Sequence, residues 1–243
     1  MNPTYVYALV GADAEVPDGL QGLGPSGRVS KMVHGKIAAI VGDVPADRPL
    51  GTRDDLMAHE KVVDTLAVQT AVLPMRFPAV VEEQGVVDEL LAPNEGFFLE
   101  ALAEIEGRQQ FALKGRYEQD VVLREVVEGD EEIRELQERV RELPEDASYY
   151  DRVRLGELIV GALEQRREVE AAKLYERLEP KVVDVVAHQP TSPEEVINAA
   201  FLVDRAHVRQ FEDAVEDLGR EFGGRIRLRL LGPLAPYDFV PEG

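Results

Sequence analysis

The strictly alternating segment RIRLRLL, residues 225–231, restricts the fold of this chain more than any other feature. Successive side chains of a strand point to opposite faces, so the pattern predicts a strand with aliphatic side chains on one face. The aliphatic face would lie against helices, and Arg225, Arg227 and Arg229 would lie on an open face of the sheet. A Gly-Pro pair at 232–233 follows, and we expect the regular ladder to end there because proline has no N–H to donate.

An α+β order of elements leads up to this strand. In chain order we expect an extended segment over 109–127, helices over 131–143 and from about 148, strands over 181–189 and 196–204, and a helix over 206–222. This order is that of the split βαβ, or ferredoxin-like, arrangement, in which helices cover one face of the sheet. The pattern therefore predicts a modified ferredoxin-like domain that contains a helical hairpin.

The two helices of the expected hairpin carry apolar residues spaced three and four apart. The first stripe is Ile133, Leu136, Val140 and Leu143, and the second is Tyr149, Val153, Gly156, Val160 and Leu163. Such spacing favours an antiparallel pair with a short, coiled-coil-like seam between the stripes. Arg167 interrupts the second stripe, so a packed hairpin is expected rather than a long rod.

The first half of the chain predicts a separate, mixed α+β sheet domain. We expect a strand over 4–10, two strands within 28–44 around a turn at His34-Gly35, a helix over about 53–69, a strand over 71–77, and helices over about 80–91 and 94–106. Thr52 precedes Asp54 and Asp55, which is typical of a helix N-cap with acidic residues in the first turn. One face of this helix is expected to carry Leu56, Val63, Leu66 and Thr70.

The pentapeptide LPMRF, which begins at Leu73, is expected to form most of a strand. Because Pro74 cannot donate to a ladder, this strand should lie at a sheet edge or carry a bulge. Met75 and Phe77 share a face with Leu73 and are expected to fill the core, while Arg76 forms an internal salt bridge. The alternative, that this segment docks another protein, stays open.

Composition excludes several classes of function. The 243 residues include 47 acidic and 27 basic side chains, for a net charge of −20. This charge repels phosphates and anionic lipid headgroups, so we expect neither nucleic acid nor a membrane as a partner. The absence of cysteine excludes disulfides and thiolate metal sites. We see no signal peptide and no apolar run near the ~18 residues of a membrane span, and a reducing cytoplasm is the simplest compartment.

No residue pattern indicates a catalytic, cofactor-binding or metal-binding site. GLGPSG at 22–27 has the G-x-G-x-x-G form, but it leads into a strand-like run and Pro25 removes an N–H, so we interpret it as a loop. The four histidines lack the spacing of a zinc site, and we expect all of them at surface positions on helices or turns. They are His34, His59, His188 and His207.

Three arginines on one strand face repel one another unless acids or a partner neutralise them. For Arg225, Arg227 and Arg229 we expect acids of the first unit or of neighbouring strands to do so. A docking face for another protein is the functional alternative.

Four stretches, in this order, resemble the gas vesicle protein L/F family (GvpL/GvpF). They are YVYALV at 5–10, AVLPMRFPAV at 71–80, RLGELIVGALE at 154–164, and INAAFLVD at 197–204 followed by LLGPLAPYDFV at 230–240. The chain departs from the family pattern at Pro78, where glycine is usual, at Leu234, where an aromatic residue is common, and at Ala235, where proline is common. These departures affect turn geometry and tail stiffness rather than membership, and the resemblance does not separate the L from the F branch.

The resemblance implies a non-enzymatic accessory or minor structural protein of gas vesicle formation. Its implied partners are the small shell protein GvpA and other accessory gas vesicle proteins, and its implied location is the gas vesicle, a cytoplasmic organelle, or the cytoplasm during assembly. The resemblance supplies no catalytic residues and no cofactor. The alternatives are a small-ligand-binding or enzymatic domain of ferredoxin-like type, since fold does not determine function, and a coiled-coil scaffold, which the short seam disfavours.

The resemblance also implies two α+β domains with the C-terminal tail packed between them. We place the N-terminal domain at 1–107, the ferredoxin-like domain at 108–231 and the tail at 232–243. The tail combines stiff and apolar residues, namely Gly232, Pro233, Pro236, Tyr237 and Phe239. We expect it to fold back as a plug at the domain interface; the alternative is a hook offered to another gas vesicle protein.

Overall fold

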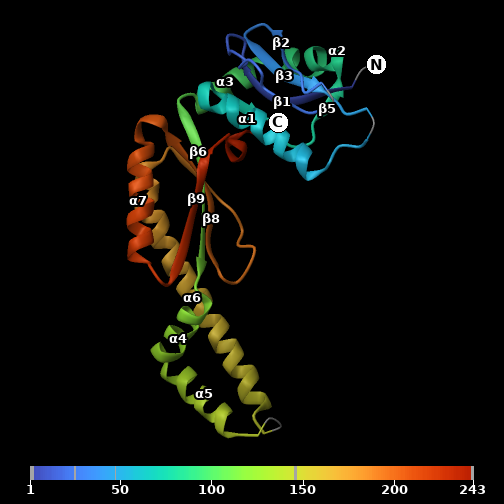
Figure 1. Cartoon of the computed structure of the whole chain (residues 1–243). Helices are drawn as coiled ribbons and strands as arrows, with labels where there is room; N and C mark the ends of the chain where they lie inside the picture. Colours follow the sequence, from blue (N-terminus) through green and yellow to red (C-terminus); the bar gives the residue numbers. More distant parts are fainter. Residues whose placement is uncertain (1–2, 25, 47, 145–146, 242–243) are drawn as a thin grey trace. The chain divides into compact units, whose positions relative to one another are not determined.

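The computed structural model of this chain describes residues 3–24, 26–46, 48–144 and 147–241, and Pro25 of the GLGPSG loop lies outside them. Contacts within the chain divide it into two compact units (Figure 1). The first unit comprises Met1–Phe111, Leu202–Arg205 and Leu231–Gly243, and the second comprises Ala112–Phe201 and Ala206–Leu230. Both sheets of the molecule are antiparallel, and the fold is α+β.

The sheet of the first unit is centred on β1 (Pro3–Gly11), which is buried from Tyr5 to Val10. Its strand order is β2-β3-β1-β4, and β5 also pairs with β1; the other strands are β2 (Val29–His34), β3 (Ile37–Asp43), β4 (Val72–Pro74) and β5 (Val80–Glu82). The predicted strands over 4–10 and within 28–44 are confirmed. The predicted strand over 71–77 is wrong beyond Pro74, where β4 ends. The end position of β4 in the order agrees with the edge position expected from Pro74.

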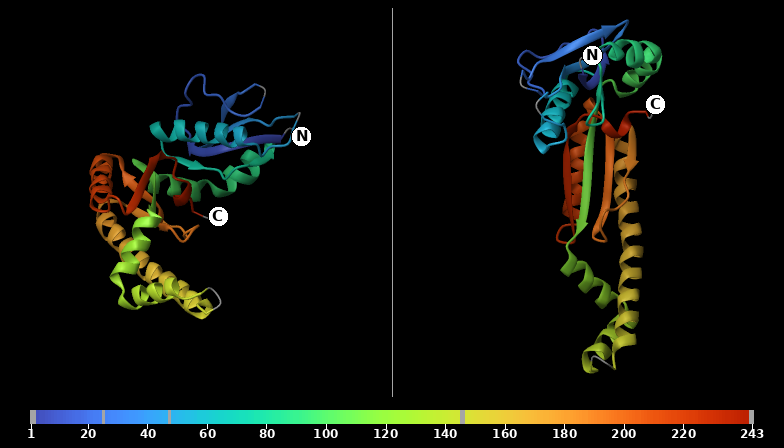
Figure 2. Two further views of the ribbon diagram at one scale, coloured as in Figure 1. Left: turned by 60° about the horizontal axis from the view of Figure 1, so that its bottom comes forward. Right: turned by 90° about the vertical axis from the view of Figure 1, so that its right-hand side faces the viewer.

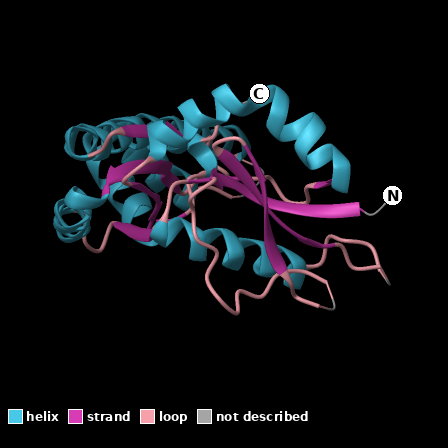
Figure 3. Cartoon of the chain, turned by 90° about the horizontal axis from the view of Figure 1, so that it is seen from above, coloured by secondary structure: helices cyan, strands magenta, loops and turns pink. Residues whose placement is uncertain are grey.

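Helices cover both faces of this sheet (Figure 3). They are α1 (Arg53–Gln69), α2 (Glu83–Gly85), the π-helix η1 (Val86–Leu91), the 3-10 turn η2 (Ala92–Asn94) and α3 (Glu95–Ile105). Thr52 caps α1 as predicted, and it forms a reciprocal capping box with Asp55. The prediction of helix from about residue 80 is wrong over 80–82, because β-branched Val80 and Val81 pair with β1 as a strand.

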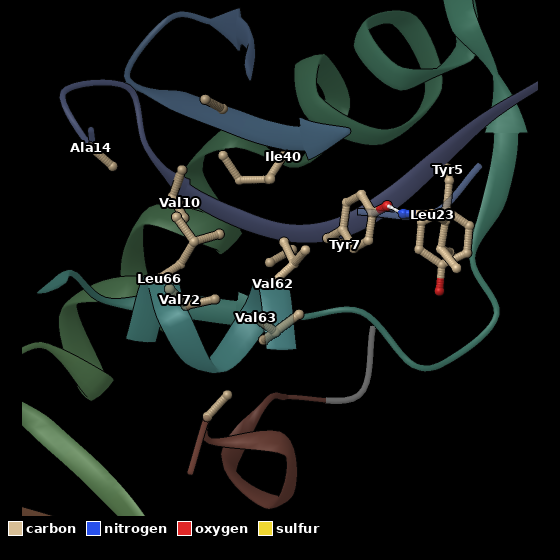
Figure 4. Close-up of a cluster of buried hydrophobic side chains, with 13 residues drawn as sticks. Tyr5, Tyr7, Val10, Ala14, Leu23, Ile40, Val62, Val63, Leu66 and Val72 are labelled. Atoms are coloured by element: carbon tan, nitrogen blue, oxygen red, sulfur yellow. Dashed lines mark hydrogen bonds between the residues drawn. The ribbon is translucent and has the colours of Figure 1, made fainter. Parts of the chain in front are cut away.

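A register shift in β1 directs its side chains into two cores. The shift lies between Val6 and Ala8, so Tyr7 and Ala8 both point to the same side of the sheet. On that side Val62, Val63 and Leu66 of α1 close the first core, which Figure 4 shows. The second core lies on the opposite face and includes Val6, Leu9, Leu91, Ala101, Leu102 and Ile105.

The second unit is built on a sheet with the strand order β7-β8-β6-β9. Its strands are β6 (Arg108–Tyr117), β7 (Asp184–Ala187), β8 (Glu195–Asp204) and β9 (Ile226–Leu234). The prediction of an extended segment over 109–127 is wrong beyond Tyr117. There α4 (Gln119–Gly129) buries Val122 and Val126, whose spacing of four suits a helix and overrides their β-branched character.

Three further helices complete the second unit: α5 (Glu131–Glu142), α6 (Tyr149–Leu178) and α7 (Val208–Glu221). Short 3-10 turns, η3 (Glu179–Lys181) and η4 (Arg205–His207), follow α6 and precede α7. In Figures 1 and 2, α4 and α5 lie beside the first half of α6, beyond the end of the sheet. The predicted stripe on α5 is buried at Ile133 and Leu136, whereas the predicted stripe on α6 is not buried: Tyr149 and Val160 are 63% and 55% exposed.

The last strand also differs from expectation at its end. β9 continues through Pro233 to Leu234 instead of stopping at the Gly-Pro pair. Gly232 makes this possible because it adopts a φ of +147°, a conformation that side chains disfavour. The chain then forms a final 3-10 turn, η5 (Tyr237–Phe239).

Candidate functional site

The C-terminal tail returns to the cores of the first unit directly after β9. The backbone N–H of Ala235 donates a hydrogen bond to Asp64 Oδ1 on α1 at 2.9 Å. Ala235 is fully buried within the first core, and Pro236 is buried beside it. The tail therefore begins as an integral part of the packing around α1.

Tyr237 then joins a group of aromatic side chains in the first core. Its ring lies 6.2 Å from that of His59, and the ring of Phe77 lies 5.8 Å from His59 on another side. Tyr5 completes the group, with its ring 6.4 Å from Phe77 and its hydroxyl 2.9 Å from His59 Nδ1. Ring-to-ring separations of this size are those of favourable aromatic pairs.

Phe239 carries the tail to the opposite core. It packs with Val240 against the second core, to which Leu73 and Met75 also contribute. The LPMRF segment and the tail thus contact the same two cores, Phe77 and Tyr237 on one side and Met75 and Phe239 on the other. The prediction that Phe77 shares a face with Leu73 and Met75 is therefore wrong, because the strand ends at Pro74 and its alternation does not continue to Phe77. We call Met75, Phe77, Tyr237 and Phe239, together with His59, Asp64 and Gln110, the tail site.

The amide of Gln110 fixes the tail between these two anchors. Gln110 Nε2 donates to Asp238 Oδ2 at 2.6 Å, and the backbone N–H of Asp238 donates to Gln110 Oε1 at 3.1 Å. Gln110 is buried, so this reciprocal pair satisfies polar groups that would otherwise be costly to bury. Nothing in the sequence pattern distinguished Gln110, because strand β6 carries it among other polar residues.

His59 is fully buried in the tail site, so the prediction of a surface position is wrong. Burial lowers the pKa of His59, and a backbone hydrogen bond to Met75 opposes this effect. The signal that could have placed His59 is the spacing of Asp55, His59, Val62 and Leu66, which lie on one face of α1. The predicted face contained Leu56 instead, which is exposed.

Two further polar groups of the tail site sit in apolar surroundings. Burial raises the pKa of the Tyr237 hydroxyl, with Asp64 adding to the effect, and no hydrogen-bond partner for this hydroxyl is found among the described residues. Burial also raises the pKa of Asp64, although the N–H of Ala235 partly offsets it. The site is thus suited to holding an apolar segment. No group of three or more His, Asp or Glu side chains in the described part of the chain could hold a metal ion.

The remaining tail and LPMRF residues lie outside these contacts. Pro74 is buried in β4, whereas Arg76 and Pro233 are exposed. Gly232 lies against β6, where a Cβ would come within 2.6 Å of a ring carbon of Phe111.

The three arginines of 225–231 belong to the second unit and are neutralised unevenly. Arg225 pairs with Glu170 of α6 at 2.9 Å, and the nearly buried Glu170 also accepts a hydrogen bond of 2.6 Å from the hydroxyl of Tyr117. Arg227 pairs with Glu118 at 2.6 Å, and Arg229 is exposed. The acids come from within the second unit, rather than from the first unit as one expectation had it.

This charge network continues beyond the arginines of the strand. Arg166 of α6 contacts both Glu125 of α4 and Glu170. A cavity of about 480 Å³ lies beside these residues, and its wall includes Arg225 and Lys173. Arg166 and Arg225 pair with Glu125 and Glu170, so the network links α4 and α6 to the residue directly before β9.

The described helices include none that is long and apolar enough to cross a membrane. The chain matches, over residues 3–241, the model of the family described as "Gas vesicle synthesis protein GvpL/GvpF". Gas vesicle protein F of Streptomyces sp. (strain CB03234) is 32% identical over 98% of this chain and 99% of its own length. Gas vesicle protein L of the same strain is 29% identical over 97% of this chain and 92% of its own length.

A solved structure extends this likeness to the fold. The crystal structure of the gas vesicle protein GvpF from Anabaena sp. PCC7120 superposes with a TM-score of 0.84 over the whole of both chains, at 23% identity. The family match covers nearly every residue, including both segments that meet in the tail site. The chain belongs to the GvpL/GvpF family of gas vesicle proteins.

Proposed function

We propose that this chain is a non-enzymatic accessory protein of gas vesicle formation, which acts by binding the small shell protein GvpA and other gas vesicle proteins during assembly. The observation that carries this proposal is the family match over residues 3–241. Its place of action would be the gas vesicle and, during assembly, the surrounding cytoplasm.

The charge of the chain supports a solubilising role. An apolar shell subunit aggregates when its surface is exposed, whereas a net charge of −20 keeps a complex in solution by repulsion between complexes. A helper of this kind needs an apolar surface or a strand edge for its client and an acidic surface elsewhere.

We also propose the finer domain layout of 1–107, 108–231 and 232–243. In support, the strands of the second sheet run second-third-first-fourth in chain order, with helices before the second and fourth, as in the ferredoxin-like arrangement. The position of the tail at a boundary between two domains stays a prediction.

The test is to express the chain together with the shell protein and the remaining gas vesicle proteins, to crosslink, and to purify the chain. We expect GvpA and at least one accessory protein to be recovered with it, and cells without the chain to form no vesicles. Vesicles that form normally without the chain would contradict the proposal. So would a crosslinked preparation that contains no gas vesicle protein.

A further inference from the structure

Helix α6 is apolar on two faces in its first half, but its own unit covers only one of them. Leu155, Ile159 and Ala162 lie on the face that is half-buried in the helical hairpin. The other face carries the stripe that the sequence places at 149–163, and it is exposed from Tyr149 to Val160 and half-buried at Leu163. A helix that is apolar on two sides usually packs on both, so the second face lacks an occupant.

We name this second face the outer stripe; it consists of Tyr149, Val153, Gly156, Val160 and Leu163. Tyr149, Val153 and Val160 are 63%, 46% and 55% exposed, and the neighbouring Tyr150 is 84% exposed. Figure 2 shows that this part of α6 extends beyond the sheet of its unit, with α4 and α5 beside it. Large apolar side chains gathered on one exposed face are typical of interaction surfaces.

The spacing of the outer stripe indicates the shape of its occupant. The residues follow one another at intervals of four, three, four and three, the repeat by which one helix packs along another. Gly156 lies at the centre, and nothing stands within 4 Å of the place where a Cβ would be. A partner helix could therefore approach closely there, over about 21 Å at 1.5 Å per residue.

The charge beside the outer stripe indicates the chemistry of its occupant. Glu157, Glu164 and Glu168 follow one edge of the stripe at intervals of seven and four, and all three are exposed. We call them the acidic line. Arg154 of α6 pairs with Glu132, and Arg166 pairs with Glu125 and Glu170, but no ion pair recorded for the described residues engages the acidic line. A helix that carries lysine or arginine at this edge would complement it.

A groove at the C-terminal end of the outer stripe would hold the end of the docked helix. Val160, Leu163 and Arg167 form one wall, and the loop from Gln189 to Pro193 forms the other, around a cavity of about 470 Å³. Pro190 and Pro193 stiffen this loop, so the groove is preformed in the free chain.

We propose that the outer stripe of α6 is a docking surface for a basic amphipathic helix of a partner protein. This inference rests on the proposed function in one respect: it names the surface by which the chain would bind a gas vesicle component. A second copy of this chain fits less well, because two acidic lines would then be brought to one interface.

The test uses a fluorescent synthetic peptide of three heptads with leucine at the a and d positions and lysine at e and g. We expect the full chain to bind it in an anisotropy titration. The double variant Val153→Asp/Val160→Asp should weaken binding by about tenfold or more, because each substitution places a carboxylate in an apolar contact. Both residues are exposed, so the variant should keep the circular dichroism and melting temperature of the parent chain.

Val169→Asp is the matched control. Val169 is 51% exposed and lies nine residues after Val160, which is about two and a half turns and thus the opposite face of α6. This variant should bind the peptide as the parent does. Glu157→Lys/Glu164→Lys should weaken binding of the lysine peptide and should favour a second peptide with glutamate at e and g.

Several outcomes would overturn the proposal. One is that the parent and the Val153→Asp/Val160→Asp variant bind the lysine peptide equally well. Another is that Val169→Asp weakens peptide binding as much as Val153→Asp/Val160→Asp does. A third is self-association of the free chain in sedimentation that Val160→Asp abolishes, which would assign the stripe to a second copy.

A cellular arm separates this inference from the proposed function. Suppose that removing the chain abolishes vesicles and that the Val153→Asp/Val160→Asp variant, at normal abundance, restores them fully. The proposed docking surface is then wrong, whereas the proposed function stands. If removing the chain leaves vesicles unchanged, the proposed function fails, whatever the peptide shows. We expect removal to abolish vesicles and the variant not to restore them.

Discussion

At the scale of single residues, the path of the tail depends on Gly232, and the packing of the tail in the first core depends on His59. Gly232 holds a φ of +147° against Phe111, which lets β9 continue before the chain turns toward α1. His59 presents a neutral ring to Tyr5, Phe77 and Tyr237 inside the first core. Neither role is visible in a pattern of apolar residues, because glycine carries no side chain and histidine is more often exposed.

Replacing Gly232 by alanine should lower the free energy of unfolding by roughly 1–3 kcal/mol, because the φ is unfavourable for alanine. The Cβ would also approach Phe111 Cδ1 within 2.6 Å and Gln110 O within 3.1 Å. Urea unfolding followed by circular dichroism measures the change. Gly219→Ala is the control, since Gly219 lies in α7 with nothing within 4 Å and should gain stability by up to about 1 kcal/mol. Equal stability of the Gly232→Ala variant and the parent would contradict the assignment.

His59 should make stability fall as pH decreases below about 7.5. Burial lowers the pKa of folded His59 below its ordinary value of 6.5, so below that value the unfolded chain binds a proton that the folded chain does not. Its contribution is therefore complete above the ordinary value and is lost as pH falls, with a slope of up to about 1.4 kcal/mol per pH unit. Asp55, whose pKa Arg48 lowers, loses its contribution only at more acidic pH.

The measurement is the free energy of unfolding in urea at a series of pH values. His59→Asn should flatten the slope in this window while lowering stability at neutral pH. His188→Asn, at an exposed position, is the control substitution. An unchanged slope in the His59→Asn variant would show that another group titrates.

At the scale of elements, the sequence of α6 does not determine which face of the helix is buried. Its first half carries two apolar stripes, and spacing alone does not say which one the hairpin buries. The outer stripe has the more regular repeat, yet the stripe of Leu155 and Ile159 faces the unit. Leu155 and Ile159 offer more apolar area for burial than Val153 and Val160, which favours that choice.

Alanine substitutions on the two stripes should separate them. Leu155→Ala should lower the free energy of unfolding by about 1–2 kcal/mol, less than for a fully buried leucine because Leu155 is only half-buried. Val153→Ala should change it by less than about 0.5 kcal/mol, as is usual at exposed positions. Urea unfolding of both variants checks this, and a larger loss with Val153→Ala would reverse the assignment of the faces.

The same ambiguity explains which elements could be predicted from the sequence. β1, the β2–β3 hairpin, α1 and α7 have one clear period and the end signals of strands or helices, and they were predicted within a few residues. Val80–Glu82 and Gln119–Gly129 were not predicted, because short runs rich in valine fit the period of a strand as well as that of a helix. Packing against the neighbouring strand or helix then determines which structure forms. In the tail site, the apolar members could be predicted, whereas His59, Gln110 and Asp64 depend on contacts distant in sequence.

At the scale of the whole molecule, the chain combines a strongly acidic composition with an apolar end. The tail could serve a partner, as a hook, or the chain itself, as a plug. Its contacts support the plug: Ala235 and Pro236 are buried in the first unit, and Tyr237 and Phe239 reach its two cores. The reciprocal hydrogen bonds of Gln110 and Asp238 would be lost if the tail left.

Deleting residues 232–243 should therefore lower the free energy of unfolding by roughly 3 kcal/mol or more, the order expected for exposing two or more apolar side chains. Urea unfolding measures this, and removal of 242–243 alone, which lie outside the described residues, is the control. If the truncated chain does not fold, the full-length variant Tyr237→Ala/Phe239→Ala provides the comparison, and a loss of about 3 kcal/mol or more is again expected. A truncated chain that is as stable as the parent but recovers no gas vesicle protein after crosslinking would instead identify the tail as a hook.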